Sequence, residues 1–256
     1  MNEPSHPAET RRLVHIHIPK TAGTAVRIAL KKLDTDGTKL FPHYEERKFQ
    51  SEDTGRYQYF SGHIGYETAS RLEGDIVTLL REPVDRFISV YFFWRELWEK
   101  GVERSRNTNL AQNYGLDEFV KIRDEPTLVE EFDNRMMYQL ALGHSMAHRR
   151  VLREANKSDR DILTEAEKHL STFAVVGIQE QLAVFERQLR QNLGLSIRVG
   201  EVNRTENRPG VADVRLDTRR QIQSWVYADL ELYHAALRQI SLTEASSVRT
   251  QPNPRL

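Results

Sequence analysis

The stretch from Val14 to Ala25, VHIHIPKTAGTA, constrains the fold of this chain more than any other. Its first half alternates apolar residues with two histidines, and this period of two predicts a strand. Pro19 and Gly23 then interrupt the pattern, and an apolar-periodic run that begins at Thr24 predicts a helix. A loop that leads into a helix N-terminus presents unpaired backbone N–H groups and the positive end of the helix dipole, so it binds anions well.

The same loop carries one cation and two hydroxyls, on Lys20, Thr21 and Thr24. The nucleotide triphosphate loop places its lysine after the second glycine, whereas Lys20 precedes Gly23, so this is a phosphate-type loop of another sort. Glycine and proline are also common at strand-to-helix turns of any α/β protein. Alone, the loop therefore favours anion binding only modestly.

A second strand-to-helix junction lies in residues 75–94, DIVTLLREPVDRFISVYFFW. The continuous apolar run Ile76–Leu80 predicts a buried parallel strand, and Pro83 suits the first turn of a following helix. Arg81 lies at the mouth of this junction. Two junctions of this kind strengthen the case for an anion site.

The motifs HIPKTAGT and LREPVDRFISVYF, in this order, resemble the sulfotransferases that use 3′-phosphoadenosine 5′-phosphosulfate, in particular the heparan sulfate 2-O-sulfotransferase branch, sulfotransferase family 2. The resemblance implies a three-layer, P-loop-like α/β fold with a central, mostly parallel sheet flanked by helices. It also implies that the first loop holds the 5′-phosphosulfate and the second segment the 3′-phosphate. The residues carried over by position are Lys20, Thr21, Ala22, Gly23 and Thr24 for the first site, and Arg81 and Ser89 for the second.

A third segment, residues 57–66 (YQYFSGHIGY), predicts an aromatic strand with His63 at its end. Open α/β sheets bind ligands at the carboxyl ends of their strands, so we expect His63 in the same crevice as Lys20 and Arg81. A lone histidine there is more often a hydrogen-bonded structural group. The resemblance implies instead that His63 matches the second histidine of the family's His-Gly-His and acts as the catalytic base, with Ser61 in place of the first.

Further residues near the expected crevice have weaker signals. The segment FAVVGIQEQLAVFERQL also resembles the family, whose members continue with a basic, threonine-containing loop over the adenosine; this implies Arg204 and Thr205 as nucleotide contacts. His15 and His17 share a strand face, but no carboxylate or cysteine pattern accompanies them. We therefore interpret them as hydrogen-bonded polar groups rather than metal ligands.

Composition limits the number of domains, the charge and the location that we expect for this protein. The 256 residues, 39% of them hydrophobic, suit one domain over residues 1–256 with flexible tails at 1–10 and 246–256. The 37 basic and 37 acidic side chains balance, so no global field draws the protein to nucleic acid or to an anionic membrane. Cysteine is absent, and the sequence has neither a signal-like apolar core nor a run of membrane-spanning length. We expect a soluble, cytoplasmic protein.

The remaining pattern predicts a short strand at 39–44, surface loops at 45–56 and 101–115, a strand at 172–178, and helices at 116–122, 128–142, 159–170, 180–193 and 217–240. Arg135 could reach substrate from the helix at 128–142. Arg149, Arg150, Arg153 and Lys157 form a basic cluster that either meets an acidic glycan or is a solvated face.

The working hypothesis is sulfuryl transfer to an acceptor hydroxyl, most simply on a carbohydrate, with His63 as general base and Lys20 stabilising the leaving phosphate. Glu67 and Glu82 are the next candidates for the base, and the hypothesis requires no metal. One alternative is a nucleotide-dependent kinase, although the strand at 76–80 ends in Arg81 rather than in an acidic Mg²⁺ ligand. Another is a non-catalytic module that binds a nucleotide or sulfated glycan through residues 149–160. Nothing in the sequence identifies the acceptor or the oligomeric state.

Overall fold

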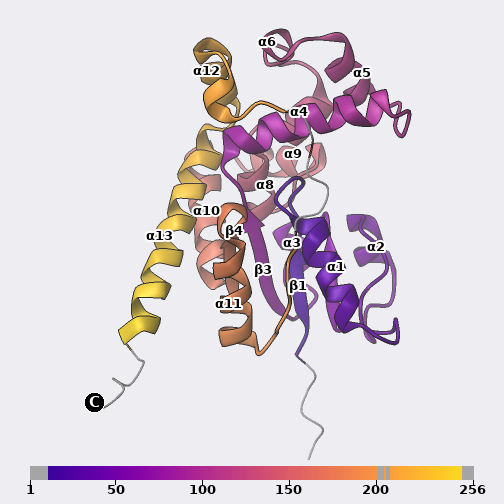
Figure 1. Cartoon of the computed structure of the whole chain (residues 1–256), viewed down its shortest axis with the longest axis vertical. Coiled ribbons are helices and arrows are strands. Elements are labelled where there is room, and N and C mark those ends of the chain that lie inside the picture. The colour runs from indigo at the N-terminus through magenta and orange to yellow at the C-terminus, as the bar shows by residue number, and fades with distance from the viewer. Residues whose placement is uncertain (1–10, 201–204, 206–207, 250–256) are drawn as a thin grey trace, which may run out of the picture.

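The computed structural model describes residues 11–200, 205 and 208–249. In this part of the chain, β1 (Leu13–Ile16), β2 (Tyr59–Gly62), β3 (Asp75–Leu80) and β4 (Val175–Ile178) form one sheet in the order β2-β1-β3-β4 (Figure 1). Every pair of neighbouring strands is parallel. The predicted parallel sheet is therefore confirmed, and the carboxyl ends of all four strands lie along one edge.

Helices cover both faces of this sheet. On one face, α1 (Gly23–Leu33) and α11 (Leu182–Leu193) pack on strand residues such as Leu13, Val77 and Val175. On the other face, α3 (Tyr66–Ser70), α8 (Arg135–Ala141), α10 (Asp159–Thr172) and α13 (Tyr227–Arg249) pack on Val14, Ile16 and Ile178. The strands are buried on both faces, which explains their nearly continuous apolar sequences. The three-layer α/β architecture is confirmed.

A second apolar core lies beyond the carboxyl edge of the sheet. It is formed by α4 (Pro83–Glu99), α5 (Arg106–Asn113), α6 (Leu116–Phe119), α7 (Pro126–Phe132) and α12 (Leu216–Trp225). Figure 1 shows α4 crossing above the strands, with α5, α6 and α12 farther from the sheet. The rings of Phe87 and Phe132 are 4.0 Å apart at the centre of this core. The helical cap therefore closes the space above the strand ends.

Two predicted long helices are each broken, and the breaks contact each other. The helix predicted at 128–142 is interrupted at Asn134, whose φ is 45°, and the helix predicted at 217–240 is interrupted at Val226. Asn134 donates its backbone N–H to the carbonyl of Trp225 at 3.0 Å, and its Oδ1 accepts from Ala228 N at 2.8 Å. Asp229 then accepts hydrogen bonds from the first turn of α8. Apolar periodicity continues through both breaks, so it could not reveal them.

Three shorter expectations are also wrong. The strand predicted at 39–44 is limited to a bridge between Leu40 and Tyr59, since Pro42 has no N–H to donate to a ladder. The loop predicted at 45–56 contains α2 (Glu46–Ser51), and the loop predicted at 101–115 contains α5, where Ser105 and Thr108 form a capping box. The other described elements are α9 (Met146–Glu154) and the 3₁₀ turns η1 (Gln179–Gln181) and η2 (Val211–Asp213).

No helix within the described ranges is both long enough and apolar enough to span a bilayer.

Candidate active site

A cavity of about 360 Å³ opens at the carboxyl edge of the sheet, beneath the helical cap. Its walls come from the loop after β1, the end of β2, the β3–α4 junction and the β4–α11 junction, together with Gly200, Thr205 and Arg208. Among the residues predicted from sequence, the cavity is lined by Lys20, Ala22, Gly23, Thr24, His63, Arg81, Ser89 and Thr205. The crevice expected to join Lys20, His63 and Arg81 is therefore present.

The loop after β1 leads into α1 without a side-chain cap. Lys20 and Ala22 both adopt left-handed backbone conformations, with φ of 65° and 67°. The helix has neither a side-chain N-cap hydrogen bond nor an acidic residue in its first turn. Its N-terminal N–H groups and dipole are therefore available to an anion. Thr21 differs from its neighbours: it is buried and donates its hydroxyl to the carbonyl of Ile18 at 2.8 Å, so it shapes the loop from below.

Gly23 is required by the ring of His17. A Cβ placed on Gly23 would lie 1.8 Å from Cδ2 and 2.3 Å from Nε2 of that ring. The ring is buried, 4% exposed, and cannot move aside freely. The absence of a side chain at Gly23 thus lets β1 and the start of α1 approach each other at the cavity.

Lys20 reaches across the cavity mouth. Its ammonium donates to Thr205 Oγ1 at 3.3 Å and lies 3.9 Å from the centre of the Phe93 ring. Burial, followed by the positive charge of Arg81, lowers the pKa of Lys20 to about 8. Below that pH, Lys20 presents a desolvated positive charge that an anionic ligand would stabilise.

Arg81 and Arg208 meet on one carboxylate. Arg81 donates from Nε to Asp85 Oδ2 at 2.8 Å, and Arg208 donates from Nη1 to Asp85 Oδ1 at 2.5 Å. Burial acts to raise the pKa of Asp85, but the hydrogen bonds and charges of the two guanidinium groups outweigh it and lower the pKa. Arg81 also donates to the carbonyl of Lys20 at 3.0 Å. Asp85 thus holds two cations together beside Ser89, which is 2% exposed and lines the cavity.

His63 follows directly after β2. Its backbone N–H donates to the carbonyl of Tyr44 at 2.8 Å, and its ring centre is 4.6 Å from that of His17. Burial is the largest influence on the pKa of His63 and, with the positive charge of Arg135, lowers it to about 4. The ring is therefore neutral at pH 7 and can accept a proton.

His15 and His17 only partly match the expectation of hydrogen-bonded polar groups. His15 Nδ1 lies 2.8 Å from Ser61 Oγ, so the serine at the position of the family's first histidine faces His15. His15 Nε2 and His17 Nδ1 have no hydrogen-bond partner within the described chain. Burial lowers the pKa of His15 to about 3 and that of His17 well below its usual value. Both rings are neutral.

A buried polar network supports the backbone around Lys20 and His63. Gln139 donates to the carbonyls of His17 at 3.1 Å and Ile64 at 2.9 Å, where β1 and β2 diverge. Its Oε1 accepts from Arg135 Nε at 3.0 Å. The network continues through Glu131 to Arg86, which donates to the carbonyl of Pro19 at 3.0 Å. Arg135 was expected to be able to reach substrate; it is instead 4% exposed and part of this network.

The basic cluster at residues 149–157 is not a single surface. Arg149 is fully buried, paired with Asp133 at 3.0 Å and stacked over the ring of Tyr138. Arg150 and Arg153 are exposed, whereas Lys157 is paired with Glu165. An acidic glycan could not contact Arg149 in this arrangement, so the expected surface cluster is wrong at that residue.

Sequence reasoning missed part of the cavity wall, namely His17 as a wall residue, Phe93, Gln179, Leu182, Gly200 and Arg208. Phe93 was detectable, since it lies one helical turn after Ser89 on the same face of α4. Arg208 had no comparable signal, because its partner Asp85 is 123 positions away. Arg204, which was predicted as a nucleotide contact, lies outside the described residues.

Within the described ranges, no group of three or more His, Asp or Glu side chains is arranged to hold a metal ion. The acidic residue nearest the end of β3, Glu82, accepts hydrogen bonds from Val84 N and Asp85 N as the N-cap of α4. The site instead combines an uncapped helix N-terminus, two guanidinium groups that share one carboxylate, and a neutral imidazole.

The model of a family described as the sulfotransferase family matches residues 7–234, which is most of the chain. A comparison with curated protein sequences gave no match.

Proposed function

Because the chain belongs to the sulfotransferase family, we propose that it transfers the sulfuryl group of 3′-phosphoadenosine 5′-phosphosulfate to an acceptor hydroxyl, with His63 as general base. The observation that carries this proposal is the single cavity lined by Lys20, His63 and Arg81. These residues come from three different strand ends, so an anionic donor and a proton acceptor would meet at one edge of the sheet.

The walls of the cavity fit a donor with two anionic ends. The uncapped N-terminus of α1 and the ammonium of Lys20 suit the 5′-phosphosulfate. Arg81, Ser89 and Arg208 suit the 3′-phosphate, since guanidinium groups bind phosphate oxygens in bidentate fashion. In this arrangement the 3′-phosphate would share Arg81 and Arg208 with Asp85.

The reaction requires one proton acceptor and stabilisation of one leaving group. The acceptor oxygen forms a bond to sulfur while the bond from sulfur to the 5′-phosphate oxygen breaks, and the hydroxyl proton passes to the ring of His63. A neutral ring, as the lowered pKa of His63 implies, is the form that can take this proton. Lys20 and the N–H groups of the loop stabilise the charge that develops on the leaving phosphate.

The acceptor in this proposal is a carbohydrate hydroxyl. Its support is the resemblance of the segment around His63 and of the two anion motifs to carbohydrate sulfotransferases. In this proposal residues 45–56 and 101–115 determine which sugar is bound.

The test is transfer of radiolabelled sulfate from the donor to a panel of polysaccharides and small alcohols. With an accepted substrate, His63→Ala should lower turnover at least about a hundredfold while the affinity for adenosine 3′,5′-bisphosphate changes little. His234→Ala, on the exposed face of α13, is the matched control and should retain turnover. Turnover that survives in His63→Ala would refute the role of His63, and absence of donor binding in the unmodified protein would refute the donor.

A further inference from the structure

Arg27 lies on α1, about one turn after the start of that helix at Gly23. Its side chain is only 8% exposed, and arginine is almost never buried unless other groups pair with it. Arg27 is not among the residues that line the cavity at the carboxyl edge of the sheet. It can therefore affect the site only through the residues that it contacts.

The guanidinium group of Arg27 donates to four backbone carbonyls from two separate segments. Nη1 donates to the carbonyl of Ser61 at 2.5 Å and to that of His43 at 3.4 Å. Nη2 donates to the carbonyls of Phe41 at 2.9 Å and Pro42 at 2.8 Å. The planar fork of an arginine can hold several oxygens in fixed directions, which a lysine ammonium cannot do. Arg27 thus joins α1 both to β2 and to the segment that precedes α2.

Residues 41–44 need donors from elsewhere in the chain. Phe41 donates its N–H to the carbonyl of Tyr59 at 2.8 Å, but Pro42 has no N–H, and the pairing with β2 is limited to the bridge at Leu40. A buried carbonyl that has lost its bonds to water costs free energy unless the protein supplies a donor. Arg27 supplies such donors to three consecutive carbonyls of this segment.

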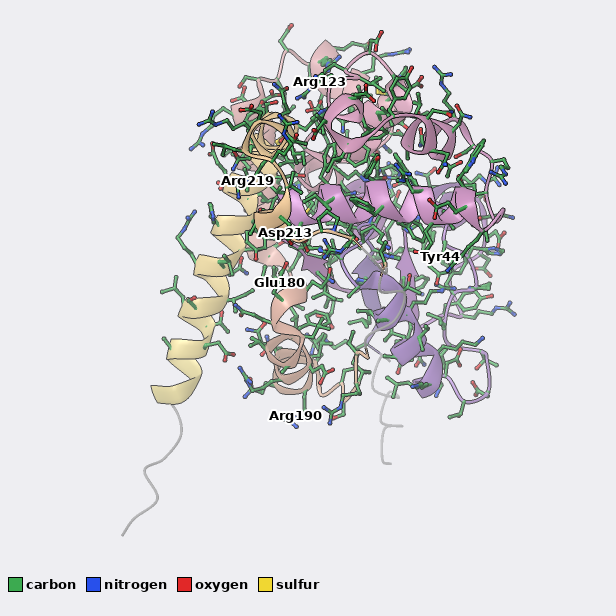
Figure 2. The ribbon with its side chains drawn as sticks, turned by 45° about the horizontal axis from the view of Figure 1, so that its top comes forward. Tyr44, Arg123, Glu180, Arg190, Asp213 and Arg219 are labelled. Carbon is green, nitrogen blue, oxygen red and sulfur yellow. The ribbon has the colours of Figure 1, made fainter. Side chains whose placement is uncertain are left out.

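His63 depends on the same segment for its own position. Its backbone N–H donates to the carbonyl of Tyr44 at 2.8 Å, and Glu45 forms an isolated parallel bridge with it. The ring centre of Tyr44 lies 4.1 Å from Cζ of Arg27 and 5.9 Å from the ring centre of His63. In Figure 2 Tyr44 lies below α4, on the side of the view where α1 lies. A continuous series of contacts therefore runs from Arg27 through Tyr44 to His63.

From these contacts, and given the proposed function, we propose that Arg27 is a positioning residue that fixes His63 relative to the start of α1. In the proposed reaction the start of α1 holds the sulfuryl donor, and His63 takes the proton of the acceptor. A general base acts only within hydrogen-bond reach of that proton, and a misplacement of about 1 Å can lower the rate about a hundredfold. Arg27 touches neither donor nor acceptor and acts by joining the helix that binds the one to the residue that serves the other.

The first test measures the position of His63 without turnover, as hydrogen exchange of backbone amides by NMR in the full chain. In Arg27→Met, exchange of the His63 N–H should accelerate at least about tenfold more than exchange of the amides of β3, because the bond to Tyr44 loosens while the sheet stays intact. Arg12→Met is the matched control, since Arg12 also donates to two backbone carbonyls, those of Leu72 at 3.2 Å and Gly55 at 2.9 Å, and does not line the cavity. It should produce no selective acceleration at His63.

The second test measures turnover with an accepted substrate. Arg27→Met should lower turnover about thirtyfold and change the affinity for adenosine 3′,5′-bisphosphate less than about threefold, while Arg27→Lys should recover at least about threefold of the lost turnover. In the His63→Ala background, Arg27→Met should lower the remaining turnover less than about threefold, because the base that it positions is already absent.

Two results would each overturn the inference and leave the proposed function standing. One is an equal loss of turnover from Arg27→Met with and without the His63 side chain. The other is exchange at His63 that accelerates no more than exchange in β3. Full turnover in His63→Ala would instead overturn the proposed base and the inference with it.

Discussion

The two strand-to-helix junctions of the cavity differ in what bonds to the free backbone N–H groups at the start of the helix. After β1, helix α1 begins without a side-chain cap and without an acidic residue in its first turn. After β3, helix α4 begins with Pro83, which lacks an N–H, and the carboxylate of Glu82 accepts from Val84 N and Asp85 N. The first junction therefore leaves its backbone donors to an anion, whereas the second uses its own and presents Arg81 and Ser89 instead.

This difference predicts which kind of substitution should disable each junction. A backbone site depends on the path of the chain, and here that path includes left-handed residues and the close approach of Gly23 to His17. A side-chain site depends on charge balance, and here Asp85 balances Arg81 and Arg208. Changes of shape should therefore disable the first junction, and changes of charge the second.

Gly23→Ala should have the largest effect. The new methyl group would overlap the buried His17 ring and displace the start of α1, so the affinity for adenosine 3′,5′-bisphosphate should fall about a hundredfold in a calorimetric titration. The double variant His17→Ala/Gly23→Ala removes the overlap and should recover at least about tenfold of that loss. Equal losses in the single and double variants would show that Gly23 acts for another reason.

Arg81→Met should have the next largest effect, and it should be selective. Loss of the charged hydrogen bonds to the 3′-phosphate should weaken binding of adenosine 3′,5′-bisphosphate roughly thirtyfold, while binding of adenosine 5′-monophosphate, which lacks that phosphate, should change less than about threefold. Arg95→Met, on the same helix but outside the cavity wall, is the control. If Arg81→Met weakened binding of both nucleotides equally, the 3′-phosphate would not be bound at this junction.

The smallest effect should come from pH. Because the pKa of Lys20 is lowered to about 8, Lys20 is charged at pH 7 and loses its proton as the pH rises through 8. Affinity for adenosine 3′,5′-bisphosphate should therefore fall about tenfold between pH 7 and pH 9. Lys20→Arg keeps its charge over this range and should show almost no slope. A slope that persists in Lys20→Arg would assign the titration to another group.

Much of the candidate site could be predicted because its signals are local. The order of Lys20, Gly23 and Thr24 between a strand and a helix lies within a few residues, and so does the spacing from Arg81 to Ser89. A parallel sheet then brings such loops to one edge, so placing His63 with them required only the strand pattern. Thr21 shows that residue type alone does not fix the direction of a side chain. A threonine suits a phosphate contact, but its hydroxyl here donates to the carbonyl of Ile18 beneath the loop.

The parts that sequence could not reveal depend on residues far apart in the chain. Arg208 joins Arg81 through Asp85, and Gln139 joins the ends of β1 and β2, over separations that no periodicity encodes. The same holds for Arg149, which was expected in a basic surface cluster and is buried against Asp133. In each case the partners met in the folded chain, rather than the local pattern, set the role of the residue.

Strand and helix periodicity, with the placement of proline and glycine, was sufficient to predict the parallel strands and the two strand-to-helix loops, because backbone preferences and turn chemistry act over a few residues. Only the folded chain decided where the helices at Asn134 and Val226 break, since Asn134 bonds to the backbone of Trp225 and of Ala228, each more than ninety positions away. Only packing likewise placed Arg135 in a buried network with Gln139 and Glu131, because burial and hydrogen-bond partners are properties of the assembled core.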